Sequence, residues 1–325
     1  MMTCVDATTT ATANPFGTPC PLVTVNGRVL DRGDAALDVH AHAVSYGTGT
    51  FEGIRAYWNP RHEQLYLGEA VRHFERLHRS ARILGLPLEF SVSELVEMTR
   101  ELLHANDVHD HAYVRPILLQ SGAVLPVRMH DIEVRLSIAV TPLPGDYLAS
   151  TGVRCMVSTW RRATDATTPN RAKVIGSYVG PALAKTEAIR AGFDEALMLT
   201  LDGFVAEATT ANVLVRFGDT WSTPPGTDDI LEGITRAQVM ALIEENTGRA
   251  VTERRIHRSE LYCADEILLC GTAATVVSVV AIDGRRVGDG TVGALGTKVR
   301  EDLWAISMRD DDRHPEWTTP VYEKG

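Results

Sequence analysis

Hydrophobic and polar residues alternate along several short segments of the chain, as they do in half-buried β-strands. Residues 22–25 and 28–30 are two such segments, and the Asn-Gly pair between them is a strong signal for a β-hairpin. The clearest alternation lies over residues 132–141, where Ile, Val or Leu occupies every second position up to residue 140. Residues 113–119 are strand-like in composition. These segments predict a β-sheet in the first half of the chain.

Two amphipathic helices are expected beside these strands. Residues 69–84 place apolar side chains at helical spacing on one face, and the segment ends at Gly85. Residues 91–105 begin with Ser-Val-Ser-Glu, the capping box that marks a helix N-terminus. The first half therefore contains strands and helices in irregular order.

A cluster of Pro and Gly over residues 142–147 is expected to be a linker, and a second set of elements follows it. We expect strands at 153–160 and 267–270, hairpin turns at Asp202-Gly203 and Asp283-Gly284, and helices at 178–190, from 234, and at 292–308. Because no regular βαβ rhythm is present, the pattern favours an α+β fold. We predict a disordered tail at 1–14, a small α+β domain at 15–146 and a large α+β domain at 147–325.

Composition narrows the classes of function. The 325 residues are 44% hydrophobic and 23% charged, which is typical of a globular protein. A formal charge of −10 argues against nucleic acid or an anionic membrane as the main partner. No segment has the length and character of a membrane span or a secretory signal. Five scattered cysteines without metal-ligand spacing are typical of a reduced, cytoplasmic protein without a structural metal.

Lysine is rare in this chain, which has only four: Lys173, Lys185, Lys298 and Lys324. Lys173 lies among small and apolar residues in the segment Ala-Lys-Val-Ile-Gly. A desolvated lysine amine can remain neutral and attack a carbonyl to form a Schiff base. A surface or ion-paired lysine is the more common case, so this residue does not decide the function by itself.

Other candidate residues are also ambiguous when each is taken alone. Glu207 follows a hairpin on a predicted strand, where its carboxylate is either held rigidly for a ligand or is an edge charge. Ile234 and Thr235 open a helix whose free amides suit phosphate. Thr272 and Ala273 follow a strand and offer a second turn with a hydroxyl. Capped turns without any ligand have the same sequence pattern.

Tyr113 and Arg115 are two residues apart on one strand, so both side chains point to the same face. This pair suits a carboxylate ligand, with an interdomain ion pair as the alternative. His40 and His42 are expected to share another strand face, but they have no evident third ligand, and we predict no metal site. On spacing alone, the Arg76 side chain is expected to be solvated.

Cys270 ends a predicted strand, and we expect it to be a buried structural thiol.

Seven motifs in order resemble the class IV aminotransferases, and the branched-chain aminotransferases in particular. They are Tyr46-Gly-Thr-Gly-Thr-Phe51-Glu-Gly-Ile-Arg55; Arg76-Leu-His; Tyr113-Val-Arg115-Pro; Ala172-Lys173 with Tyr178; Ala206-Glu207 with Asn212; Leu231-Glu-Gly-Ile234-Thr235-Arg236; and Ala264-Asp-Glu with Gly271-Thr272-Ala273-Ala274. The resemblance covers about residues 23–296, and so many ordered motifs are far more specific than one.

The resemblance implies a two-domain fold-type IV pyridoxal-phosphate enzyme, with the D-amino acid aminotransferase-like fold. In that family Lys173 would hold the cofactor as a Schiff base and carry the proton of the substrate Cα. Glu207 would face the pyridine nitrogen and keep it protonated. Tyr178 would donate to the phenolate oxygen of the ring, and Leu231 would pack against the ring, with Thr210 nearby.

The remaining roles also come from the resemblance. Arg76, Ile234, Thr235 and Thr272 would hold the phosphate. Tyr46, Phe51 and Val127 would line the substrate side-chain pocket, while Tyr113, Arg115, Thr272 and Ala273 would receive carboxylates. The implied reaction is a ping-pong transfer of the amino group of an L-amino acid, branched-chain or otherwise hydrophobic, to 2-oxoglutarate. The implied assembly is a homodimer or higher homo-oligomer.

Three segments depart from the family pattern, at residues 123–128, 143–144 and 208–212, and the last of them places Thr210 near the cofactor. Changes of this kind alter specificity, since each pocket contact is worth about 1–3 kcal/mol. A specialised class IV aminotransferase for an unusual or D-amino acid or an amine therefore stays open. So does a lyase of the aminodeoxychorismate lyase type. A cofactor-binding homologue without turnover is disfavoured, because such a protein does not need Lys173, Tyr178, Glu207 and Arg76 together.

Overall fold

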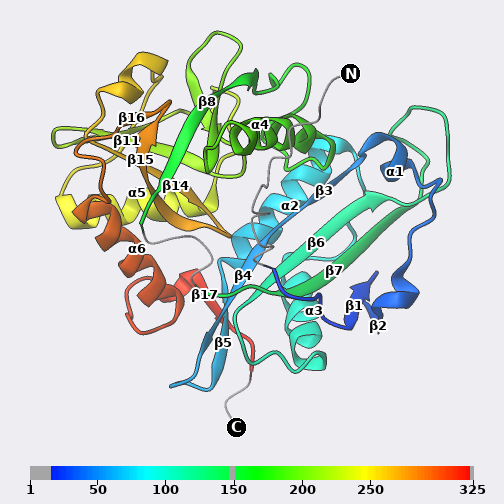
Figure 1. The fold of residues 1–325 in the computed structure, drawn as a ribbon. Helices are drawn as coiled ribbons and strands as arrows, with labels where there is room; N and C mark the ends of the chain where they lie inside the picture. The colour runs from blue at the N-terminus through cyan, green and yellow to red at the C-terminus, as the bar shows by residue number, and fades with distance from the viewer. Residues whose placement is uncertain (1–15, 146–150, 323–325) are drawn as a thin grey trace, which may run out of the picture.

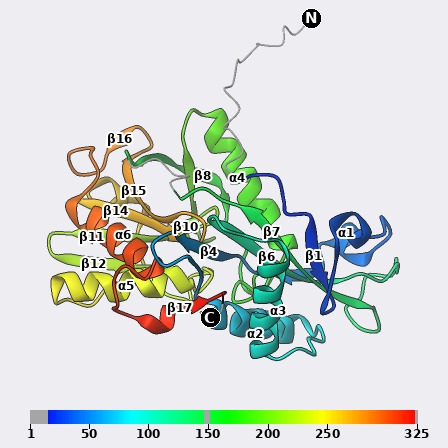
Figure 2. The same cartoon turned by 90° about the horizontal axis from the view of Figure 1, so that it is seen from below.

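The computed structural model describes residues 16–145 and 151–322, and in them two β-sheets lie side by side with helices packed on both (Figures 1 and 2). This mixture of strands and helices confirms the predicted α+β class. The predicted tail at 1–14 and the end of the predicted linker lie outside the described residues.

The first sheet has eight strands in the order β17-β5-β4-β6-β7-β1-β2, with β3 paired to β6, and all its pairings are antiparallel. Its strands are β1 (Leu22–Val25), β2 (Arg28–Asp31), β3 (Gly49–Phe51), β4 (Ile54–Asn59), β5 (Gln64–Gly68), β6 (Ala112–Gln120), β7 (Val134–Pro142) and β17 (Thr318–Pro320). The helices α2 (Ala70–Leu84) and α3 (Val92–Ala105) bury Phe74, Leu77 and Leu102 against this sheet.

The second sheet has nine strands, and β8 pairs in parallel with both β9 and β15. Its strands are β8 (Val153–Arg161), β9 (Glu195–Leu199), β10 (Val205–Ala208), β11 (Asn212–Phe217), β12 (Thr220–Thr223), β13 (Thr252–Glu253), β14 (Glu266–Gly271), β15 (Thr275–Ile282) and β16 (Arg285–Arg286). The helices α5 (Ile234–Thr247) and α6 (Ala294–Ser307) share one core cluster with it, and α4 (Val179–Arg190) packs on β8 and β9.

Two connections tie the sheets together. Near the end of the chain, β17 adds to β5 of the first sheet. At the centre, the Lys173 carbonyl accepts hydrogen bonds from Phe51 N at 3.1 Å and from Thr50 Oγ1 at 2.9 Å. Lys173 is therefore held against β3. The division at residues 146 and 147 stays a prediction, and the structure places residues 318–320 in the first sheet.

The helices and turns with strong local signals lie close to where they were predicted. The capping box of α3 is present, with Ser91 accepting from Glu94 N, and α2 ends at Gly85, whose φ of 68° favours glycine. The strand predicted for His40 and His42 is wrong. His42 begins the short helix α1 (His42–Tyr46) and is buried, with Nδ1 2.8 Å from Thr48 Oγ1.

Candidate active site

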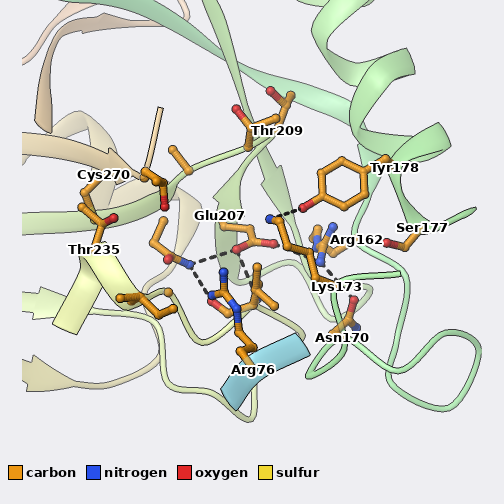
Figure 3. Close-up of a pocket in the computed structure, with 18 of the residues that line it drawn as sticks. Arg76, Arg162, Asn170, Lys173, Ser177, Tyr178, Glu207, Thr209, Thr235 and Cys270 are labelled. Atoms are coloured by element: carbon orange, nitrogen blue, oxygen red, sulfur yellow. Dashed lines mark hydrogen bonds and ion pairs between the residues drawn. The ribbon is translucent and has the colours of Figure 1, made fainter. Parts of the chain in front are cut away.

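One cavity is lined by all nine residues that we expected around a cofactor, and Figure 3 labels five of them, Arg76, Lys173, Tyr178, Glu207 and Thr235. The nine residues are Arg76, Lys173, Tyr178, Glu207, Thr210, Leu231, Ile234, Thr235 and Thr272. These residues come from α2, the segment before α4, β10, the N-terminus of α5 and the end of β14. The fold therefore gathers them from positions almost 200 residues apart.

Lys173 is fixed at its backbone and projects its amine into the cavity. Its N–H donates to Ser80 Oγ of α2 at 3.1 Å, in addition to the two bonds that its carbonyl accepts from β3. Its Nζ donates to Tyr178 Oη at 2.7 Å (Figure 3). Because β3 and α2 both anchor the backbone, the amine has a defined position beside a phenol.

Glu207 is a buried carboxylate with three partners. Its Oε1 lies 2.9 Å from Arg162 Nη2, and its Oε2 accepts from Asn212 Nδ2 at 2.9 Å and from Leu231 N at 3.2 Å. Burial raises the pKa of Glu207, while Arg162 and the Leu231 amide act in the opposite direction. The pairing register shifts between Val205 and Glu207, a kind of irregularity that re-aims side chains. A cationic ligand atom in the cavity would further favour the charged form of this carboxylate.

The N-terminus of α5 faces the same cavity without a side-chain cap. Gly233 precedes the helix, and a Cβ at that position would come 1.9 Å from Asn212 Oδ1, so only glycine fits. The amides of Ile234 and Thr235 therefore lie in the first turn of an uncapped helix that lines the cavity. Such an N-terminus is an anion site, since its N–H groups and the helix dipole both favour negative charge.

Arg76 is buried next to this anion site, so the expectation from spacing alone, a solvated guanidinium, is wrong. Its Nε and Nη2 donate to the two carboxylate oxygens of Glu52 at 2.7 and 2.8 Å, and Nη1 donates to Glu232 O at 3.1 Å. Glu52 is fully buried. Burial alone would raise the pKa of its carboxyl, but Arg76 and His73 hold that pKa well below the usual range.

Three of the residues expected to bind substrate lie together beside Lys173. The Arg115 guanidinium is 4.5 Å from the ring centroid of Phe51 and 5.1 Å from that of Tyr113. The Phe51 ring packs edge-on against Tyr178, with 4.9 Å between centroids. Among the described residues Arg115 has no carboxylate within ion-pair distance, so its guanidinium is available to an anionic ligand.

Ala273 adjoins Thr272, and its carbonyl accepts from Arg55 Nη1 at 2.7 Å. Tyr46 and Val127 lie elsewhere, on the surface. Their exposed fractions are 41% and 78%, and Tyr46 Oη donates to Leu125 O instead of facing the cavity. The described residues of one chain therefore do not bring these two side chains to the cavity.

Several residues of the site were missed. Glu52 and Arg55 stand inside the first motif, and a charged residue within an otherwise apolar strand signals burial with a partner. His73 lies on the buried face of α2, which its spacing from Phe74 and Leu77 could have indicated. Arg162 follows a strand, and nothing in its local sequence indicates that it contacts Glu207.

Cys270 also lines the cavity, at the end of β14. Burial raises the pKa of its thiol to about 12. A thiol that remains protonated is a poor nucleophile. The predicted burial of Cys270 is confirmed, and its structural role stays a prediction.

Comparison with known proteins agrees with this geometry. Residues 49–282 match the family "Amino-transferase class IV". The chain belongs to this family. A protein of Aquifex aeolicus named "Probable branched-chain-amino-acid aminotransferase" is 41% identical over 92% of this chain and 96% of its own length. The branched-chain-amino-acid aminotransferase of Escherichia coli is 33% identical over 91% and 96%.

Solved structures of class IV aminotransferases share the fold closely. The branched-chain aminotransferase of Thermoproteus uzoniensis with norvaline has a TM-score of 0.88 at 37% identity, covering 93% of this chain and 100% of that one. The branched-chain amino acid aminotransferase of Thermobaculum terrenum, solved in its PLP-form, has a TM-score of 0.89 at 30% identity, covering 94% and 99%. The two-sheet fold described above is thus the fold of the branched-chain aminotransferases.

Proposed function

We propose that this protein is a pyridoxal-phosphate-dependent branched-chain aminotransferase that transfers the amino group of a branched-chain L-amino acid to 2-oxoglutarate. The observation that carries the proposal is the arrangement of one cavity. It has a lysine amine beside a phenol on one wall, the buried carboxylate of Glu207 on another, and an anion site at the N-terminus of α5. The relatives reported above act, by their names, on branched-chain amino acids.

The residues present fit this cofactor. Arg76, the amides of Ile234 and Thr235 and the hydroxyl of Thr272 form a set of donors suited to a phosphate dianion. Glu207 is fixed by partners that leave it able to accept a hydrogen bond from a pyridine nitrogen, whose positive charge would offset the burial of the carboxylate. Bound there, the cofactor supplies an electron sink for the substrate carbanion.

The chain's own residues supply binding, orientation and proton transfer. Lys173 Nζ would hold the cofactor covalently, and as a free amine it would carry the proton of the substrate Cα. Tyr178 Oη, 2.7 Å from that amine, orients it. Leu231 and Thr210 line the cavity where the ring is expected, and Leu231 N helps to fix Glu207.

Substrate carboxylates are assigned to the cluster beside Lys173. Arg115 and Tyr113 would bind a carboxylate. The turn at Thr272 and Ala273 would be a second binding site for a carboxylate. The ring of Phe51 lies between Arg115 and Tyr178, and it offers an apolar wall for a branched side chain. A dicarboxylate and a branched amino acid can therefore use the same site in turn, as a ping-pong reaction needs.

We also propose that the protein is a cytoplasmic homodimer or higher homo-oligomer. Apolar side chains are exposed on α1, on the loop after β6 and on α4, among them Val44, Leu125, Val127 and Val179. Gly176, just before α4, donates its N–H to Gly47 O at the end of α1, so two of these segments are adjacent. Exposed apolar surface of this kind is typical of a protein interface. Light scattering coupled to size exclusion would test the assembly, and a monomer would refute it.

No described helix is long and apolar enough to span a membrane.

The half-reaction tests the function. Single L- and D-amino acids are added to the purified holoenzyme without a keto acid, and the conversion of the cofactor to pyridoxamine phosphate is followed by absorbance. We expect conversion with L-leucine, L-isoleucine and L-valine. Conversion only with a D-amino acid or another amine would keep the reaction and refute the substrate class. Product release without conversion of the cofactor would refute transamination in favour of a lyase.

A further inference from the structure

His73 lies behind the anion site and contacts the cavity only through other residues. It belongs to α2 and is buried, with Nδ1 2.7 Å from Glu52 Oε2 and Nε2 3.5 Å from Thr272 Oγ1. Glu52 in turn binds Arg76 through both of its oxygens. The imidazole thus connects the counter-ion of one phosphate donor to the hydroxyl of another.

The protonation state of this ring decides what the Thr272 hydroxyl can do. Glu52 can only accept, so Nδ1 carries a hydrogen and donates it. In the neutral ring Nε2 is then bare, and it accepts the hydroxyl hydrogen of Thr272 and turns it away from the cavity. In the protonated ring Nε2–H donates to Thr272 Oγ1. The hydroxyl hydrogen is then free to point into the cavity.

We propose that His73 takes up a proton from solvent when a phosphate dianion binds, and that this proton sets Thr272 as a donor to the phosphate. The proposal rests on the proposed function, since that function brings the phosphate group. His73 is a positioning residue in this scheme, because it acts through Thr272 and touches no ligand atom.

Charge balance points in the same direction. Before a ligand binds, the buried charges of Glu52 and Arg76 cancel, and burial lowers the pKa of His73, with Glu52 acting in the opposite direction. A phosphate monoester adds about two negative charges at this point. Two nearby cations, Arg76 and Lys173, disfavour a proton on His73, and the dianion offsets them.

Other charged groups also lie near the ring. His73 lines a small second cavity together with Arg55 and Glu69, and Thr235 and Thr272 line both this cavity and the main one. Arg55 and Glu69 carry opposite charges, and the charges that act most on the pKa of His73 are instead those of Glu52, Arg76 and Lys173. The phosphate is therefore the change that decides the protonation of His73.

The sign of the pH dependence follows from linkage. If the pKa of His73 is higher in the bound state, affinity is greatest below the pKa of the free state. Affinity then falls as pH rises through the bound-state pKa. Binding near neutral pH takes up a proton. The phosphate and pyridine groups of a ligand titrate as well, so the contribution of His73 is obtained as a difference between two proteins.

The test uses pyridoxamine 5'-phosphate and apoenzyme, because this amine cannot form a Schiff base with Lys173. Calorimetric titrations near pH 7.5, in two phosphate-free buffers of different ionisation enthalpy, give the number of protons taken up. We expect wild type to take up close to one proton more than His73→Gln, since one imidazole is removed (about one proton). His104→Gln, which changes an exposed histidine at the end of α3, should match wild type.

Equal uptake by wild type and His73→Gln would overturn the proposal while leaving the aminotransferase function intact, which turnover on the same preparation would establish. Failure of wild type to bind pyridoxamine 5'-phosphate would refute the proposed cofactor and this inference together. If His73→Gln does not fold, nitrogen-15 NMR of histidine-labelled wild type decides. A histidine whose Nε2 gains a proton on binding supports the proposal, and the absence of any such change contradicts it.

Discussion

Replacing Glu52 by Gln should destabilise the protein much more than a surface substitution of the same kind. The Glu52 carboxylate is fully buried and accepts two charged hydrogen bonds from Arg76, at 2.7 and 2.8 Å, and a third from His73 at 2.7 Å. An amide of the same shape keeps one acceptor oxygen and presents N–H groups where the second oxygen stood. Arg76 then remains buried without its counter-ion.

Removing one partner of a buried ion pair lowers the free energy of unfolding by about 3–5 kcal/mol. Because glutamine keeps one acceptor oxygen, we expect the loss for Glu52→Gln to lie near the lower end of this range. We expect the apoenzyme to melt on the order of 5 °C lower. Glu75→Gln is the matched control, because Glu75 is an exposed residue on α2, next to Arg76, and its loss should change stability by less than about 0.5 kcal/mol. Thermal denaturation in phosphate-free buffer measures both variants.

The dependence on pH checks the physical reason. The pKa of Glu52 is depressed in the folded state, because burial is outweighed by Arg76 and His73. A depressed carboxyl contributes stability that is fully present above its unfolded pKa of about 4.3 and is lost as pH falls through its folded pKa. The difference between wild type and Glu52→Gln should therefore be constant from pH 5 to pH 8 and shrink below about pH 4. Equal melting temperatures for Glu52→Gln and Glu75→Gln would refute this account of the ion pair.

Three further substitutions test the proposed roles. Lys173→Ala should abolish transamination and the absorbance of the covalently bound cofactor, and substantial activity in a purified variant would contradict its role. For Glu207→Gln we expect bound cofactor but a rate at least about a hundredfold lower in single-turnover absorbance, because a neutral amide cannot keep the pyridine nitrogen protonated. Arg115→Ala should raise KM for 2-oxoglutarate by tenfold or more while the cofactor affinity stays within about twofold, and steady-state kinetics with a cofactor titration would reveal the opposite pattern.

Local signals in the sequence predicted those elements whose boundaries are set by a few adjacent residues. The capping box of α3 and the glycine that ends α2 are of this kind, as is the Asn-Gly turn between β1 and β2. Strand β4 was missed because it is buried on both faces, so its apolar residues do not alternate with polar ones. The buried Arg55 within it interrupts the apolar run further.

The residues of the site also fall into two groups, those that local motifs indicate and those that depend on distant contacts. Lys173, Glu207 and the first turn of α5 stand in recognisable motifs, and the resemblance located them together. The residue pairs beside the anion site depend on distant contacts. Glu52 and Arg76 are 24 residues apart, and His73 and Thr272 are 199 residues apart, so no window of sequence contains either pair. The solvated Arg76 expected from spacing alone was wrong because helical periodicity indicates a face but not the partner that covers it.

The charges of the site show why a negative net charge of the chain does not exclude a small anionic ligand. Four basic side chains surround the cavity and the substrate cluster, namely Arg76, Arg162, Lys173 and Arg115. Within the part of the chain that the structure describes, only two carboxylates pair with them: Glu52 pairs with Arg76, and Glu207 pairs with Arg162. The site is therefore cationic within a chain whose formal charge is −10. Under the proposed function, a phosphate would add negative charge beside Arg76 and the first turn of α5, and a substrate carboxylate would add it beside Arg115. Because Arg76 is buried and screened little by salt, its hydrogen bond to a phosphate should persist at ionic strengths that suppress surface electrostatics.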